Sequence, residues 1–150
     1  MIRLLEKNEP LPWTLLLDAD PDKEVVERYI YDSEILVDCR KETIVACLVY
    51  QIRGAEAELL NLAVLPSHQR QGIAKDLIKQ ALLMIQAHAA KPTTVLVKTG
   101  NSTLPALALY KQMGFQEVAR IKDYFLTHYR EKIYEEGILL TDQIILSQTI

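Results

Sequence analysis

The sequence predicts an α/β fold in which a mixed, mostly antiparallel sheet carries helices on both of its faces. Apolar runs rich in β-branched residues alternate along the chain with segments of helical period. Three strand-like runs follow one another with short polar breaks, as antiparallel strands do, and the later ones are separated by helical segments. At 150 residues the chain suits one domain, so we expect a single domain over residues 1–150.

The first third of the chain contains one short strand, two helices and a hairpin. Residues 2–5 form the strand candidate, and residues 13–17 and 22–31 have helical character. The apolar runs "EILVDCR" (34–40) and "TIVACLVYQIR" (43–53) are separated by charged residues, which indicates an antiparallel hairpin.

The middle of the chain reads as a strand, a loop and a long helix. The run "AELLNLAVL" (57–65) is apolar at nearly every position, which predicts a strand buried on both faces. After Gly72 the apolar residues recur at spacings of three and four, which predicts a helix that ends near residues 88–91, before Pro92.

The last third predicts further strands around one short helix. Residues 93–99 form a strand candidate, and residues 104–113 a helix that Gly114 ends with a left-handed C-cap. Residues 115–121 begin the next strand, and residues 138–146 form the last one.

Composition excludes several classes of function. The net charge of −3 gives no general attraction to nucleic acid or to an anionic membrane. Apolar runs are far shorter than the roughly 20 residues that cross a bilayer, and the first residues lack the pattern of a signal peptide, so we expect a cytoplasmic protein. Cys39 and Cys47 lie in apolar surroundings and are expected to pack as small hydrophobes, with no metal site.

The segment "QRQGIA" lies where the central strand gives way to the long helix. A helix N-terminus exposes unpaired N–H groups and a partial positive charge, and Gly72 allows positive φ and close approach of a ligand. Ala74 leaves the first turn uncluttered, while Arg70 and Lys75 add positive charge. These features suit a pyrophosphate, although a plain strand-to-helix turn would explain the loop alone equally well.

The neighbouring residues extend this pattern. The loop matches Gln/Arg-x-x-Gly-x-Gly/Ala, and it is followed by Asn101 at a strand end, Tyr110 in a helix and a terminal Gly114-Phe115. In this order the motifs resemble the GNAT superfamily of acyl-CoA-dependent N-acetyltransferases, closest to a small bacterial subgroup of undefined substrate. The resemblance covers essentially the whole chain and implies the GNAT fold, with acetyl-CoA as co-substrate.

The resemblance also implies a cofactor site. The backbone of Leu62, Ala63 and Val64 would pair with the pantetheine arm, and the N–H of Val64 would stabilise an oxyanion. The pyrophosphate would lie on the loop formed by Gln69, Arg70, Gln71, Gly72, Ile73, Ala74 and Lys75. Asn101 would contact pantetheine or adenosine, or it could form only an Asx turn or a helix N-cap.

The implied catalytic acid is Tyr110, which would protonate the departing CoA thiolate. It could instead be a tyrosine that packs its ring and exposes its hydroxyl. The base is open between Glu58 on the central strand and His128, and Glu58 could instead be a solvated carboxylate at the start of the strand. Asn61, on the same strand as Glu58, could orient a water or a main-chain group.

The stretch "DYFLTHYREKIYEEG" is dense in aromatic residues and carboxylates. In the GNAT fold it would lie near the acceptor site, where the following residues could line a pocket for a cationic amine: Tyr124, Phe125, His128, Tyr129 and Glu135. A capping loop at the sheet edge is the equal alternative.

Together these features predict transfer of an acetyl group from acetyl-CoA to a primary amine, on a small molecule, by direct attack. The alternatives are a non-catalytic acyl-CoA-binding regulatory module and an enzyme that acetylates protein amines. A homodimer is also open, because related folds often dimerise.

Overall fold

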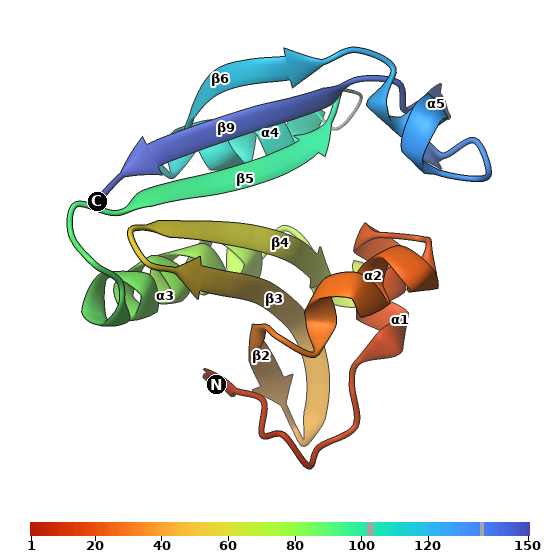
Figure 1. The fold of residues 1–150 in the computed structure, drawn as a ribbon. Coiled ribbons are helices and arrows are strands. Elements are labelled where there is room, and N and C mark those ends of the chain that lie inside the picture. Colours follow the sequence, from red (N-terminus) through yellow and green to blue (C-terminus); the bar gives the residue numbers. More distant parts are fainter. Residues whose placement is uncertain (102–103, 136) are drawn as a thin grey trace.

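A seven-stranded sheet forms the centre of the protein (Figure 1), whose computed structural model describes residues 1–101, 104–135 and 137–150. In spatial order its strands are β1 (Ile2–Leu4), β2 (Glu34–Arg40), β3 (Thr43–Arg53), β4 (Glu56–Val64), β5 (Thr94–Gly100), β9 (Gln143–Thr149) and β6 (Gln116–Ile121). A small separate hairpin consists of β7 (Tyr134–Glu135) and β8 (Ile138–Leu139). The helices are α1 (Trp13–Ala19), α2 (Lys23–Ile30), α3 (Ile73–His88), α4 (Leu104–Gln112) and α5 (Tyr124–His128).

Helices cover both faces of the sheet, as the sequence predicts. On one face α1 and α2 bury Leu16, Val26 and Ile30 against the side chains of β2 and β3. On the other face the buried stripe of α3 packs in the same core as Tyr110 of α4 and Phe115. That stripe consists of Ile73, Leu77, Ile78, Ala81 and Ile85. Each fully buried Leu or Ile stabilises the fold by about 1.5–3 kcal/mol, so this period of three and four fixes the helix on the sheet.

The strands from β1 to β4 pair antiparallel, and β4 and β5 then pair parallel. This parallel pairing joins residues 56–59 of β4 to residues 94–97 of β5 and goes no further. Beyond Leu59, β4 stays paired to β3 and β5 stays paired to β9, so the two strands separate toward their C-terminal ends (Figure 1). The sheet therefore opens at its centre.

A β-bulge in β4 lies where this opening begins. Leu59 pairs with Tyr50 and Asn61 with Val49, which leaves Leu60 as the extra residue. As a result Leu59 packs in the core beneath α3, whereas Asn61 points to the opposite face and contacts α1. The prediction that β4 is buried on both faces holds only in part, because Glu58, Leu60, Leu62 and Val64 are half-buried.

The predicted last strand, residues 138–146, is wrong in its bounds. The structure divides it into β8 and β9 at residues 140–142, because other partners take the backbone there: Leu140 N–H bonds to Ile133 C=O, and Thr141 N–H bonds to Asn101 Oδ1. Helix α5 was not predicted, and it follows Asp123, whose φ is +56°. None of the helices in the described ranges is long and apolar enough to cross a membrane.

Candidate active site

The edge of β4 that faces the opening offers backbone groups to a ligand. Leu65 N–H bonds to Val45 C=O on β3. Successive peptide groups of a strand point to opposite edges, so the N–H groups of Val64 and Leu62 point toward the opening. The C=O of Val64 accepts a hydrogen bond of 3.1 Å from Gln69 Nε2, which ties the following loop to the strand.

The loop after β4 presents an uncapped helix N-terminus beside this edge. A 3-10 turn at Pro66–His68 leads into the loop, where Arg70 has φ +63° and Gly72 has φ +81°. The first helical hydrogen bond of α3 runs from Asp76 N–H to Gly72 C=O, and no side chain caps the helix. The N–H groups of Ile73, Ala74 and Lys75 therefore precede the helical hydrogen-bond ladder and are available to an anion.

Gly72 opens onto free space. A Cβ built on Gly72 would meet no atom of the described residues within 4 Å. The glycine is thus required by its backbone conformation and leaves room for a ligand, and the predicted left-handed turn is present.

Tyr110, on α4, lies in the core beneath the sheet with 7% of its surface exposed. Its ring packs edge-on against Phe115 at a centroid distance of 5.9 Å, and Phe115 N–H bonds to Tyr110 C=O around Gly114, where φ is +98°. Burial raises the pKa of Tyr110 to about 12, so the phenol keeps its proton at neutral pH. A tyrosine in this state can donate a proton or a hydrogen bond but cannot act as a base.

Asn101 follows β5, on the other side of the opening. Its amide forms a reciprocal pair with Thr141: Nδ2 donates to Thr141 Oγ1 at 3.2 Å, and Oδ1 accepts from Thr141 N–H at 3.1 Å. These bonds hold the end of β5 to the segment before β9, so the side chain has a structural role. A direct contact with the cofactor stays a prediction, and the N-cap alternative concerns residues 102–103, outside the described ranges.

The two β4 residues considered for catalysis lie on different sides of the bulge. Glu58 lies opposite Leu96 in the part of β4 that β5 closes, and its carboxylate is 3.6 Å from Lys98 Nζ. Asn61 lies in the open part, where Nδ2 donates to Leu16 C=O at 3.0 Å and to the Tyr29 hydroxyl at 3.1 Å.

A half-buried carboxylate that sequence analysis missed lies beyond Asn61. Asp20, the C-cap residue of α1, accepts hydrogen bonds from the hydroxyls of Tyr129 at 3.0 Å and Tyr29 at 3.5 Å. Burial raises the pKa of Asp20, although both tyrosine hydrogen bonds oppose that rise. No local motif marks these residues, because Tyr29 comes from the next helix and Tyr129 lies 109 residues after Asp20.

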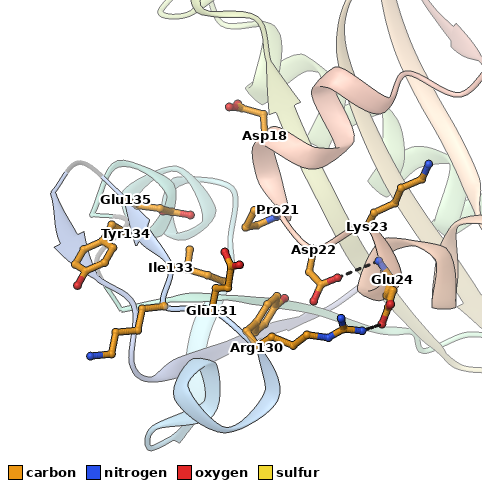
Figure 2. Close-up of a pocket in the computed structure, with 12 residues that line it drawn as sticks. Asp18, Pro21, Asp22, Lys23, Glu24, Arg130, Glu131, Ile133, Tyr134 and Glu135 are labelled. Carbon is orange, nitrogen blue, oxygen red and sulfur yellow. Dashed lines mark hydrogen bonds and ion pairs between the residues drawn. The ribbon is translucent and has the colours of Figure 1, made fainter.

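A pocket of about 600 Å³ lies between the α1–α2 connection and residues 129–135 (Figure 2). Its charged side chains are the carboxylates of Asp18, Asp22, Glu24, Glu131 and Glu135 and the cations of Lys23, Arg130 and Lys132. Arg130 crosses from one wall to the other and forms an ion pair with Glu24 (Figure 2). Carboxylates outnumber cations in this pocket, so it favours a positively charged molecule.

Two of the five residues predicted for the acceptor pocket line it, namely Tyr129 and Glu135. The other three belong to α5 and do not line the pocket. Tyr124 stacks on His128 at 4.2 Å, and His128 Nδ1 lies 3.0 Å from Tyr124 C=O. Phe125 stacks on Tyr129 at 5.5 Å and so supports the pocket wall from behind.

The two cysteines do not line this pocket. Cys47 is buried in β3, where burial raises its thiol pKa to about 12, and Cys39 is half-buried. A thiol that keeps its proton, as at Cys47, is not the reactive thiolate that covalent catalysis needs.

Comparison with known proteins agrees with this geometry. Residues 31–117 match the family described as "Acetyltransferase (GNAT) domain". The chain is 34% identical over 142 residues to the Bacillus subtilis protein called "Uncharacterized N-acetyltransferase YvbK", covering 94% of this chain and 90% of that protein.

Two solved structures are also similar over the whole chain. A GNAT family acetyltransferase from Elizabethkingia anophelis with acetyl-CoA bound has a TM-score of 0.93 and 32% identity, over 100% of this chain and 97% of that one. An IAA acetyltransferase from Bacillus cereus has a TM-score of 0.92 and 32% identity, over 100% of this chain and 99% of that one. The chain belongs to the GNAT family and is an acetyl-CoA-dependent N-acetyltransferase.

Proposed function

We propose that the protein transfers the acetyl group of acetyl-CoA to the primary amine of a small cationic molecule, by direct attack. The observation that carries the proposal is the opening between β4 and β5, flanked by the uncapped N-terminus of α3 on one side and an acidic pocket on another.

Acetyl-CoA would enter through this opening. The backbone of Leu62, Ala63 and Val64 would pair with the amides of pantetheine, much as a missing strand would. The pyrophosphate would bind residues 69–75, with the N–H groups of Ile73, Ala74 and Lys75 as donors. Gln69 would act indirectly, because its side chain is bonded to Val64 C=O.

The acyl-transfer step needs an oxyanion donor and an acid. A neutral amine attacks the thioester carbonyl, and the C–S bond then breaks. The Val64 N–H would bind the oxyanion, a kind of contact worth about 10²–10³-fold in rate. Tyr110 would give its proton to the thiolate, and the proton that the nitrogen loses after attack would restore the phenol.

The acceptor would bind in the acidic pocket. Its carboxylates attract ammonium groups and raise their local concentration. A volume of about 600 Å³ suits a small molecule better than a folded protein surface.

A panel assay tests the proposal. The protein and acetyl-CoA would be mixed with polyamines, aminoglycosides, amino acids or short peptides, and released CoA would be measured with a thiol reagent. A reaction without acceptor corrects for Cys39 and Cys47. We expect release with polycationic small amines, and activity with peptides alone would overturn the small-molecule acceptor.

A further inference from the structure

Asp20 connects the acidic pocket to the open part of β4. Tyr129 lines the pocket, and its hydroxyl donates to Asp20 Oδ1 at 3.0 Å. On the other side, Tyr29 donates to Asp20 Oδ2 at 3.5 Å and accepts from Asn61 Nδ2 at 3.1 Å. One hydrogen bond therefore links the Asp20 carboxylate to Tyr129 in the pocket wall. Two successive hydrogen bonds, through Tyr29, link it to Asn61 on β4, the strand that faces the opening.

This chain of contacts leaves one acceptor atom without a donor. Asn61 is 6% exposed, and within the described residues its Oδ1 is a buried oxygen with no hydrogen-bond partner. Buried oxygens in proteins are normally bonded, since leaving one unpaired costs about 1–3 kcal/mol. An ammonium or amine N–H would supply the missing donor.

We propose that Asp20 binds the ammonium group of the acceptor and accepts its proton, and that Tyr29, Tyr129 and Asn61 position the two groups. The inference rests on the proposed function and assigns the base of that reaction. It replaces Glu58 in this role, because Glu58 faces Lys98 in the part of β4 that β5 closes.

The protons balance in this scheme. The bound ammonium gives one proton to Asp20 and becomes a neutral amine. Its lone pair forms the C–N bond, the C–S bond breaks, and the thiolate takes the proton of Tyr110. The nitrogen then loses its second proton, which restores the phenol, and Asp20 releases its own proton to water.

The groups around Asp20 act on its pKa in opposite directions. Burial raises its pKa, and the nearby Asp22 carboxylate adds to the rise. Hydrogen bonds from the Tyr129 hydroxyl, the Asp22 backbone N–H and the Tyr29 hydroxyl oppose it. Tyr29 and Tyr129 themselves stay protonated, because burial raises the pKa of each. Cys47, behind Tyr29, is a neutral thiol.

The test is the pH dependence of kcat at saturating acetyl-CoA, using the best amine of the panel. We expect Asp20→Asn to lose about 100-fold in kcat and to lose the acidic limb of the profile. Tyr129→Phe removes a hydrogen bond that favours the carboxylate, so it should move that limb to higher pH. Asp32→Asn makes the same charge change on an exposed turn and should match the wild type.

Wild-type kcat and an unchanged acidic limb in Asp20→Asn would overturn the inference. An acidic limb of the kcat profile that stays at its wild-type pH in Tyr129→Phe would also overturn the inference. This variant decides the test if Asp20→Asn does not fold. If the wild type acetylates no amine of the panel, the small-molecule function fails separately. Carbon-13 NMR titration of Asp20 in CoA-bound protein then decides: added spermidine should lower the Asp20 pKa, and no change would overturn the inference.

Discussion

The hydroxyl of Tyr129 donates a hydrogen bond of 3.0 Å to the carboxylate of Asp20, 109 residues earlier in the chain. Asp20 ends α1, and Tyr129 follows α5, which lies by the other half of the sheet (Figure 1). The bond therefore spans the opening between β4 and β5 on the acceptor side. It joins the two segments that form the walls of the acidic pocket, the α1–α2 connection and residues 129–135.

Replacing Asp20 should reveal a conflict between stability and activity. Burial raises its folded-state pKa, so above the unfolded-state value of about 4 the unfolded chain ionises more readily than the folded one. Stability is then lost as the pH rises through the folded pKa. We expect Asp20→Asn to be more stable than the wild type against urea at pH 8, and nearly equal to it near pH 4.

The opposite ordering, with Asp20→Asn less stable at pH 8, would mean that the tyrosine hydrogen bonds outweigh burial. Asp32→Asn controls for the change in net charge.

Alanine substitutions at two comparable glycines test whether the loop before α3 binds the pyrophosphate of CoA. Gly72 and Gly54 both have positive φ, and a Cβ on either meets no described atom within 4 Å. Alanine at each should therefore cost a similar amount, about 1–2 kcal/mol of unfolding free energy. We expect only Gly72→Ala to weaken CoA binding, by about tenfold or more in calorimetry, because its methyl group enters the ligand's space. Equal CoA affinities in the two variants would argue against a pyrophosphate on this loop.

The sequence predicted those parts of the site that depend on local chemistry. Gly72 and Gly114 were expected in left-handed backbone, and both have positive φ. The apolar stripe of α3 predicted its buried face, since the helical period can be read within one segment.

The sequence could not show what depends on register or on distant contacts. Leu60 and Leu62 are equally apolar, so no pattern reveals that a bulge at Leu60 turns Asn61 toward α1. Likewise, the break at Thr141 depends on Asn101, 40 residues earlier. Asp20 was missed for the same reason, because its tyrosine partners come from two other elements.

Asn101 should contribute mainly to stability. Its amide makes two hydrogen bonds to Thr141 at the end of β5, and losing them should cost about 1–3 kcal/mol in Asn101→Ala. Urea unfolding measures this cost, and Thr141→Val should be non-additive with it, because both changes remove the bond to Oγ1. A loss of CoA affinity with unchanged stability would instead make Asn101 a cofactor ligand.

Tyr110→Phe should separate chemistry from binding. Burial raises the phenol pKa to about 12, and no hydrogen bond joins its hydroxyl to any described residue, so its removal should cost little stability. We expect kcat to fall by about 10²-fold or more while CoA affinity stays at the wild-type value. Tyr50→Phe is the matched control, since Tyr50 is also buried, with a pKa raised to about 12 by burial, but lies within β3. Equal kcat values in the two variants would show that thiolate departure needs no phenol, and protonation by solvent would then account for it.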